Sequence, residues 1–210
     1  MIAVILGWGI GLVILLFVER LHKHGHIRLE LARKIIHLVS GLILVVWSFF
    51  IAWQTIILME VTFFALAMLT RWFKLFDSQR TVNRISWGEF FFPIGVVLSI
   101  FLGAPRWVFI LAILHLAVAD AAAALVGEKY GRSNSYRVFG QKKSVAGTAA
   151  FFVVSMILIS ATFLMGPSNL TATTKSLLLC LPVLTTIAEN LGVYGTDNLI
   201  IPLVVVLLLS

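Results

Sequence analysis

Eight runs of apolar residues occupy most of this chain of 210 residues, and short polar stretches separate them. A helix crosses the hydrocarbon core of a bilayer with roughly 20 apolar residues, and it satisfies its backbone hydrogen bonds internally. We therefore expect an all-α, polytopic integral membrane protein of about eight transmembrane helices, forming one domain over residues 1–210. The expected spans are about 2–18, 35–53, 55–70, 87–103, 107–127, 145–165, 176–190 and 198–210.

The charge content of the chain favours a bilayer environment over water. Only 12% of the residues are charged and 60% are hydrophobic, whereas a soluble domain has about 25% charged residues. On an average soluble protein, the formal net charge of +7 would suggest nucleic acid as a partner. In a membrane chain the positions of the basic residues matter more than their sum, so we expect membrane lipids and no nucleic acid as partners.

Basic residues are concentrated in three of the connections between the expected spans. Only Arg106 and Lys175 fall in the other connections. The positive-inside rule places the three basic connections in the cytosol and, with an even number of spans, both termini on the non-cytosolic side. The fourteen residues of the three connections are Arg20, Lys23, Arg28, Arg33, Lys34, Arg71, Lys74, Arg80, Arg84, Lys129, Arg132, Arg137, Lys142 and Lys143.

The stretch from Asp120 to Thr148 combines a carboxylate with glycines and basic residues. Asp120 lies near the cytosolic end of the fifth expected span, where an ionisable group is costly and often functional. A nucleoside triphosphate with a divalent metal needs a carboxylate for the metal and cations for the phosphates. The stretch therefore predicts a metal–nucleotide site at the bilayer surface. The alternative is a carboxylate paired with a lysine from a neighbouring loop.

The start of the sixth expected span has the features of a phosphate site. Small residues let backbone N–H groups approach an anion, and a helix N-terminus carries partial positive charge. Lys142 and Lys143 precede this helix start and would bind phosphates as point charges. The alternative is the ordinary basic flank of a membrane helix. The small residues are Ser144, Ala146, Gly147 and Thr148.

Two glycines, Gly127 and Gly131, bracket the turn expected after the fifth span. Each would allow either a positive φ or the close approach of a ligand.

Polar groups at the starts of two other spans are candidates for the same site. Arg33 and His37 share one face of the second expected helix, because they are four residues apart. Arg33 would bind a phosphate and His37 would orient a carboxylate, although Arg33 and Lys34 also fit interfacial snorkelling. Glu89 lies in the first turn of the fourth span, where the helix dipole alone would favour an acid.

The last expected cytosolic connection has carboxylates and carboxamides but no basic residue. Glu189 and Asp197 are each followed directly by an asparagine, Asn190 and Asn198. This composition suits a metal or a hydroxyl group better than a lipid head group. His115 lies deeper in the membrane, and interhelical hydrogen bonding is the simpler reading of it.

Four motifs, in their order along the chain, resemble a known family of membrane enzymes. The chain resembles the CTP-dependent lipid-alcohol kinases, which comprise the dolichol, polyprenol, phytol and farnesol kinases and the CTP-dependent diacylglycerol kinase. The related phosphatidate cytidylyltransferases have a long carboxy-terminal signature that this chain lacks. The motifs are RKIIH at 33–37, DAAAALVGEKYGR at 120–132, QKKSVAGT at 141–148 and DNLIIP at 197–202.

The resemblance implies an enzyme that uses CTP with Mg²⁺, and it implies a role for each motif. Asp120 would serve the metal and the nucleotide, and Ala119 stands where the family often has glycine before this aspartate. The residues implied to line the CTP site are Gly127, Lys142, Lys143 and Gly147. The residues that match other family elements are Arg33 and Lys34 (the paired basic residues), Glu89 (the GE-x-x-x-P element), and Glu189 with Asp197–Asn198 (the last polar loop).

The expected nucleotide site lies at the cytosolic face, where CTP is available. Mg²⁺ would be held by Asp120 together with Asp197 or Glu189, since this ion needs only one or two carboxylates beside waters and phosphates. Arg132 would join the two lysines on the triphosphate, and Arg33 would stabilise the transferring γ-phosphoryl group.

The expected acceptor is the hydroxyl group of a membrane isoprenoid alcohol at the same face. Either Glu189 or Asp197 would accept its proton, and its tail would enter between helices beside Ala121–Ala124. Diacylglycerol kinase and cytidylyltransferase activities remain alternatives within the resemblance. A transporter or a structural membrane protein is the alternative from another class. The sequence leaves the chain length of the alcohol and the oligomeric state open.

Overall fold

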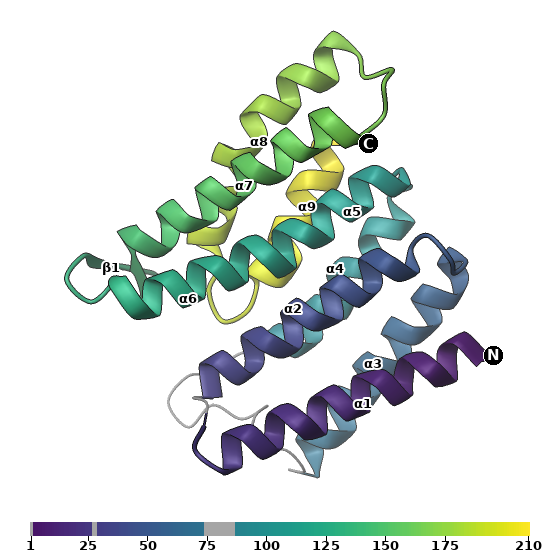
Figure 1. Cartoon of the computed structure of the whole chain (residues 1–210), viewed down its shortest axis with the longest axis vertical. Helices are drawn as coiled ribbons and strands as arrows, with labels where there is room; N and C mark the ends of the chain where they lie inside the picture. The colour runs from purple at the N-terminus through teal and green to yellow at the C-terminus, as the bar shows by residue number, and fades with distance from the viewer. Residues whose placement is uncertain (1, 27–28, 74–86) are drawn as a thin grey trace.

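The computed structural model describes residues 2–26, 29–73 and 87–210. Four of the basic residues used for the expected orientation, Arg28, Lys74, Arg80 and Arg84, lie outside these ranges. In the described ranges the chain forms a bundle of helices with one small hairpin at its end (Figure 1).

Each expected apolar run contains a helix, but the second expected span, 35–53, was wrong at its end, because α2 ends at Trp47 and residues 48–52 form the turn before α3. Residues 106–130 form one continuous rod, made of α5 (Arg106–Leu114), the π-helical turn η2 (His115–Ala119) and α6 (Asp120–Tyr130). The other helices are α1 (Ile2–Lys23), α2 (Leu29–Trp47), α3 (Trp53–Trp72), α4 (Gly88–Phe101), α7 (Val145–Met165), α8 (Ala172–Leu191) and α9 (Asp197–Leu209). The expected eight helical rods are therefore present in the described part of the chain.

Four of these rods have the length and hydropathy of a membrane span: Ile5–Lys23, Trp53–Trp72, Arg106–Tyr130 and Val145–Met165. Helices α4 and α9 are apolar but shorter, with 14 and 13 residues. Large apolar side chains remain exposed along the outer surfaces of the rods, as a hydrocarbon solvent requires. The chain thus has the architecture of a multi-pass integral membrane protein.

The hairpin is the one departure from the all-α expectation among the described residues. Strand β1 (Ser135–Val138) pairs antiparallel with β2 (Gln141–Ser144), so that Tyr136 lies opposite Lys143. Its two turn residues, Phe139 and Gly140, both have positive φ, which is the geometry of a tight two-residue turn. The polar strands lack the alternation of apolar residues by which a sequence reveals a strand.

Neighbouring helices pack side by side in the bundle (Figure 1). Helix α7 lies between α6 and α8, while α2 contacts α1 on one side and the α5–α6 rod on the other. Helix α9 packs against α4, α5 and α8. Figure 1 shows both termini toward the end of the bundle opposite to the hairpin. The hairpin, the start of α2 and the end of α8 therefore lie at the same end of the bundle.

A buried chain of hydrogen bonds joins the α5–α6 rod to α7 and α8, and it begins at His115, five residues before Asp120. The Nδ1 atom of His115 lies 2.9 Å from the Leu111 carbonyl oxygen, and its Nε2 atom lies 2.7 Å from Ser155 Oγ on α7. Ser155 Oγ lies 3.2 Å from Thr185 Oγ1 on α8. The structure thus confirms interhelical hydrogen bonding as the role of His115. Because His115 begins the π-helical turn, it also holds the bulge that immediately precedes Asp120.

Candidate active site

One cavity of about 420 Å³ opens among α2, α6, the hairpin, the start of α7 and the α8–α9 connection. It collects every sequence-predicted site residue except Glu89. These residues are Arg33, Lys34, His37, Asp120, Gly127, Arg132, Lys142, Lys143, Ser144, Gly147, Thr148, Glu189, Asp197 and Asn198. We refer to it as the charged cavity. Segments up to 165 residues apart in the chain meet there, between Arg33 and Asn198.

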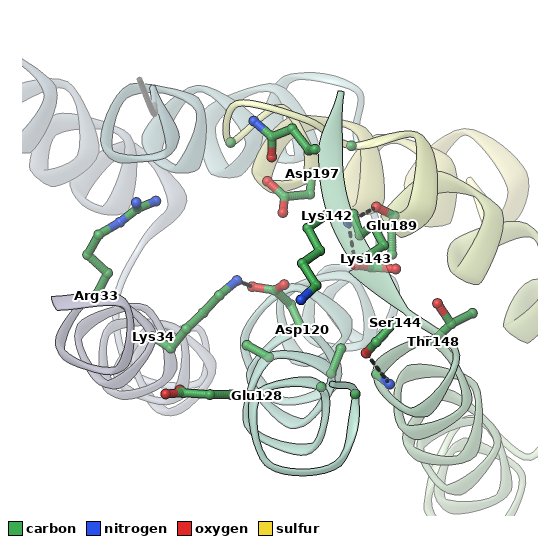
Figure 2. A pocket seen from close by; sticks show the side chains of 18 of the residues that line it. Arg33, Lys34, Asp120, Glu128, Lys142, Lys143, Ser144, Thr148, Glu189 and Asp197 are labelled. Carbon is green, nitrogen blue, oxygen red and sulfur yellow. Dashed lines mark hydrogen bonds and ion pairs between the residues drawn. The ribbon is translucent and has the colours of Figure 1, made fainter. Parts of the chain in front are cut away.

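Asp120 and Lys34 line the charged cavity from two facing helices, α6 and α2. Asp120 is 4% exposed at the first position of α6, and its Oδ2 atom accepts a hydrogen bond from Lys34 Nζ of α2. The partner of this carboxylate is thus a lysine, as in the simpler alternative, but it comes from a facing helix and itself lines the cavity. Figure 2 shows Lys34 and Lys142 both extending toward Asp120.

The two lysines of the hairpin have different environments, although they are neighbours in sequence. Lys143 Nζ donates to Glu189 Oε1 at 2.5 Å and to the Glu189 carbonyl oxygen at 2.6 Å. The second carboxylate oxygen of Glu189 is buried and has no hydrogen-bond partner among the described residues. Lys142 points to the other face of β2, where it is exposed at the cavity mouth. Lys143 therefore fastens the hairpin to α8, and Lys142 is available to a ligand.

The start of α7 is a capped helix N-terminus that lines the charged cavity. Ser144 is the N-cap residue, and its Oγ accepts a hydrogen bond from the Gly147 N–H at 3.1 Å. Gly147 faces Gly127, so that the backbones of α6 and α7 approach closely beside the cavity. Backbone N–H groups at such a helix start favour an anion.

The structure corrects the expected position of Gly127 and excludes a positive φ at both glycines. Gly127 lies inside α6 and not in the turn after it, because the helix continues to Tyr130. Neither Gly127 nor Gly131 has a positive φ. Other parts of the protein approach both glycines closely, since a Cβ atom would lie 2.9 Å from Ser144 Oγ at Gly127 and 2.3 Å from the Gly127 carbonyl oxygen at Gly131.

We expect Gly147→Ala to destabilise the fold by about 1–3 kcal/mol, because its Cβ must push α6 away from α7. The added atom would lie 2.8 Å from the Ala123 carbonyl oxygen and 3.0 Å from Ser144 Oγ. Unfolding in detergent micelles measures the change. Gly11→Ala is the matched control, since a Cβ there has no neighbour within 4 Å. Equal stability of the two variants would contradict the close packing of α6 on α7.

The carboxamides near the end of the chain hold elements together around the cavity. Asn198 is buried and donates from Nδ2 to the Gly88 carbonyl oxygen at 3.0 Å, which joins α9 to α4. Asn190 Oδ1 accepts hydrogen bonds from Tyr136 and Thr148, so it links the hairpin, α7 and α8. Asp197, in contrast, is half-buried and its Oδ1 accepts only from the next backbone N–H, at 3.1 Å, in the described hydrogen bonds.

Three chemically useful side chains of the cavity were missed by the sequence analysis: Glu128, Gln141 and Tyr194. Glu128 and Gln141 lie inside the motifs already identified, directly after Gly127 and before Lys142, so their position was a usable signal. Tyr194 adopts a positive φ of 56° beside Gly195 in the α8–α9 connection, and no residue pattern indicated this conformation.

Glu89 is the one predicted site residue that the charged cavity excludes. It lies instead in a second, smaller cavity, and its Oε1 atom lies 2.7 Å from Arg71 Nη1. The guanidinium group of Arg71 stacks over the Trp87 ring, 4.4 Å from its centroid. Arg33 and His37 line both cavities.

The donor set of the charged cavity fits a magnesium–nucleotide complex. No three His, Cys, Asp or Glu side chains form a metal cluster within the described ranges. Magnesium bound with a nucleotide does not need such a cluster, because phosphates and waters supply most of its ligands. One buried carboxylate at Asp120, a second acid at Asp197 and the nearby cations are sufficient for this mode of binding.

The fold and this cavity define a membrane protein in which acidic and basic side chains from distant segments converge on one cavity. The chain is 30% identical to the phytol kinase of Synechocystis sp. over 199 residues, which cover 90% of this chain and 82% of that protein. On this evidence the chain belongs to the family of CTP-dependent lipid-alcohol kinases. No protein-family model matches the chain, and no solved structure matches it.

Proposed function

We propose that this lipid-alcohol kinase transfers the γ-phosphoryl group of CTP to the hydroxyl group of a membrane isoprenoid alcohol. One observation carries the proposal: acidic and basic side chains from four separate segments converge on one cavity at an end of an otherwise apolar bundle. The relative named phytol kinase supports an isoprenoid acceptor. The preference for CTP rests on the family, because no side chain of the cavity identifies a cytosine base.

The triphosphate would lie beside the start of α7, where Ser144, Gly147 and Thr148 line the charged cavity and the helix N-terminus favours an anion. Lys142 and Arg132, both exposed at the cavity mouth, would contact its oxygens. Lys143 would add charge from its fixed position beside Glu189. Phosphoryl transfer depends mainly on such positioning and charge neutralisation.

Asp120 would hold Mg²⁺, with Asp197 as the second carboxylate of the same cavity. When bound, the ion neutralises developing charge on the phosphates. Lys34 pairs with Asp120 in the structure, and we propose that it turns to a phosphate oxygen when the metal complex binds. Arg33 would stabilise the γ-phosphoryl group on the α2 side of the cavity.

We propose that the charged cavity faces the cytosol and that both termini lie on the opposite side of the membrane. The basic connections support this orientation through the positive-inside rule. A cytosolic opening also gives CTP direct access, while the hydroxyl group of a membrane alcohol rests at the same interface.

A product analysis tests the proposed reaction. Purified protein in detergent or lipid receives Mg²⁺ with either γ-labelled or α-labelled CTP, and phytol, geranylgeraniol, a long polyprenol, diacylglycerol or phosphatidate as acceptor. We expect the γ label, and not the α label, to move to a prenol. ATP in place of CTP is the matched control for the donor.

Each other outcome contradicts a different part of the proposal. Transfer of the γ label to diacylglycerol alone would make the protein a diacylglycerol kinase. Formation of a CDP-lipid from phosphatidate with release of pyrophosphate would make it a cytidylyltransferase. Transfer to no acceptor by folded protein would favour a transport or structural role.

A further inference from the structure

A second cavity adjoins the charged cavity and lies among α2, α3 and α4. Its volume is about 40 Å³. Arg33, His37 and Ser40 line it from one face of α2, because they are four and three residues apart. Arg33 and His37 belong to both cavities, so these two side chains form the partition between them. We refer to the smaller space as the acceptor cavity.

The acceptor cavity changes from charged to apolar along the bundle axis. Its charged residues are Arg33, which also lines the charged cavity, and Glu89, which lies in the first turn of α4. Ser40 lies about 10 Å further along α2. Phe63 lies eight residues before Arg71 on α3, which places it about 12 Å deeper than that arginine. A hydroxyl group at the charged end would therefore leave its hydrocarbon chain directed toward the membrane interior.

The carboxylate of Glu89 is held in place at the charged end. Its side chain is 12% exposed, and Arg71 binds one oxygen at 2.7 Å. Arg71 is itself fixed between two aromatic rings, 4.4 Å from the centroid of Trp87 and 5.5 Å from that of Phe90. On the opposite wall the His37 ring meets the edge of Phe92, with 5.3 Å between centroids. A capping role for Glu89 needs none of this arrangement.

We infer that the acceptor cavity binds the hydroxyl end of the lipid alcohol and that Glu89 accepts its proton. This inference rests on the proposed kinase activity. The alcohol oxygen forms a bond to the γ-phosphorus while the bond from that phosphorus to the β,γ-bridging oxygen breaks, and CDP leaves with the electron pair. Arg33 and His37 border the transferring group from the partition. Glu89 takes this role in place of Glu189 and Asp197, which line the nucleotide side.

The acceptor cavity is small, with a volume of about 40 Å³, and Phe63 and Phe92 line it. We infer that its occupant is the slender hydroxymethyl end of a single-chain primary alcohol, which is narrower than the ester-branched end of diacylglycerol. Its tail runs beside Phe63 and not beside Ala121–Ala124, of which Ala123 and Ala124 line the charged cavity.

Filling the acceptor cavity tests this assignment. We expect Ser40→Phe to lower kcat/KM for phytol or geranylgeraniol about 10²-fold, with unchanged affinity for Mg²⁺–CTP in a direct binding measurement. Ser160→Phe is the matched control, because Ser160 is exposed on α7 outside both cavities. Wild-type transfer by Ser40→Phe would overturn the inference while leaving the kinase activity intact. Absence of transfer by the wild-type protein would overturn both.

A measurement on the unaltered protein does not depend on the folding of a variant. A phytol analogue with a photoreactive diazirine close to the hydroxyl group is activated in the presence of Mg²⁺ and CDP. We expect the label on 33–40, 63 and 89–92. Label on 121–124 would overturn the inference and restore the path beside the small residues of α6.

Substitution of the acid tests the proton acceptor separately from the cavity. We expect Glu89→Gln to lower kcat about 10²-fold or more, with the KM for CTP and the unfolding midpoint close to those of the wild type. A purely structural Glu89–Arg71 pair would instead lower the unfolding midpoint and leave kcat per folded molecule unchanged. A loss of kcat in Asp197→Asn but not in Glu89→Gln would return the role to Asp197.

Discussion

Asp120→Asn is expected to lower kcat/KM for CTP by about 10³-fold and to raise the Mg²⁺ concentration needed for half-maximal activity. The substitution keeps the size of the side chain and its hydrogen bond from Lys34, but it removes the charge that would hold the metal. Phosphorylation of a prenol at a series of Mg²⁺ concentrations measures the effect. A variant that retains more than about a tenth of wild-type activity would make Asp120 a structural partner of Lys34 only.

The pairing of Asp120 with Lys34 requires a control for stability. Lys34 is 17% exposed, so the loss of its partner charge leaves a largely buried cation. The double variant Asp120→Asn with Lys34→Met removes both charges and should recover the unfolding midpoint without recovering activity. Recovery of activity together with stability would show that the single variant was inactive because it misfolded.

Substitution by methionine is expected to lower stability at Lys143 and to weaken CTP binding at Lys142, although the two lysines are neighbours in the hairpin. Lys143→Met should destabilise the protein by about 3 kcal/mol, because it leaves the buried carboxylate of Glu189 without its charge partner. Lys142→Met should leave stability unchanged and raise the KM for CTP about tenfold, because this exposed cation would contact the triphosphate at the cavity mouth. Unfolding midpoints and CTP kinetics of the two variants measure the contrast.

A double variant tests whether the stability lost in Lys143→Met comes from the uncompensated charge of Glu189. Lys143→Met combined with Glu189→Gln should regain most of the lost stability, since the uncompensated charge is removed with its partner. Similar stability of the two single lysine variants would contradict the different environments of Lys142 and Lys143. Tight CTP binding by Lys142→Met would exclude this lysine from the triphosphate site.

Much of the site was predictable because its residues lie in short motifs at the ends of apolar runs. A charged group inside a membrane span is costly, so Asp120 stands out from the apolar residues around it, and Lys142 and Lys143 stand out by the small residues that follow them. The same reasoning grouped Glu89 with them, yet Glu89 lies in a different cavity. A motif places a residue at one end of the bundle, but the rotation of each helix decides which cavity its side chain enters.

Apolar run length alone predicted about eight helices, and the described residues form eight helical rods, four of which are long and apolar enough to cross a membrane. Helices are expected for such runs because they satisfy their backbone hydrogen bonds internally in a bilayer. Only the tertiary structure decided which charges are partners, since Lys34 and Asp120 are 86 residues apart and Lys143 and Glu189 are 46 apart. It also revealed the hairpin, whose polar strands carry no periodic signal. These features depend on how helices and strands meet in space, and no local pattern of residues records that geometry.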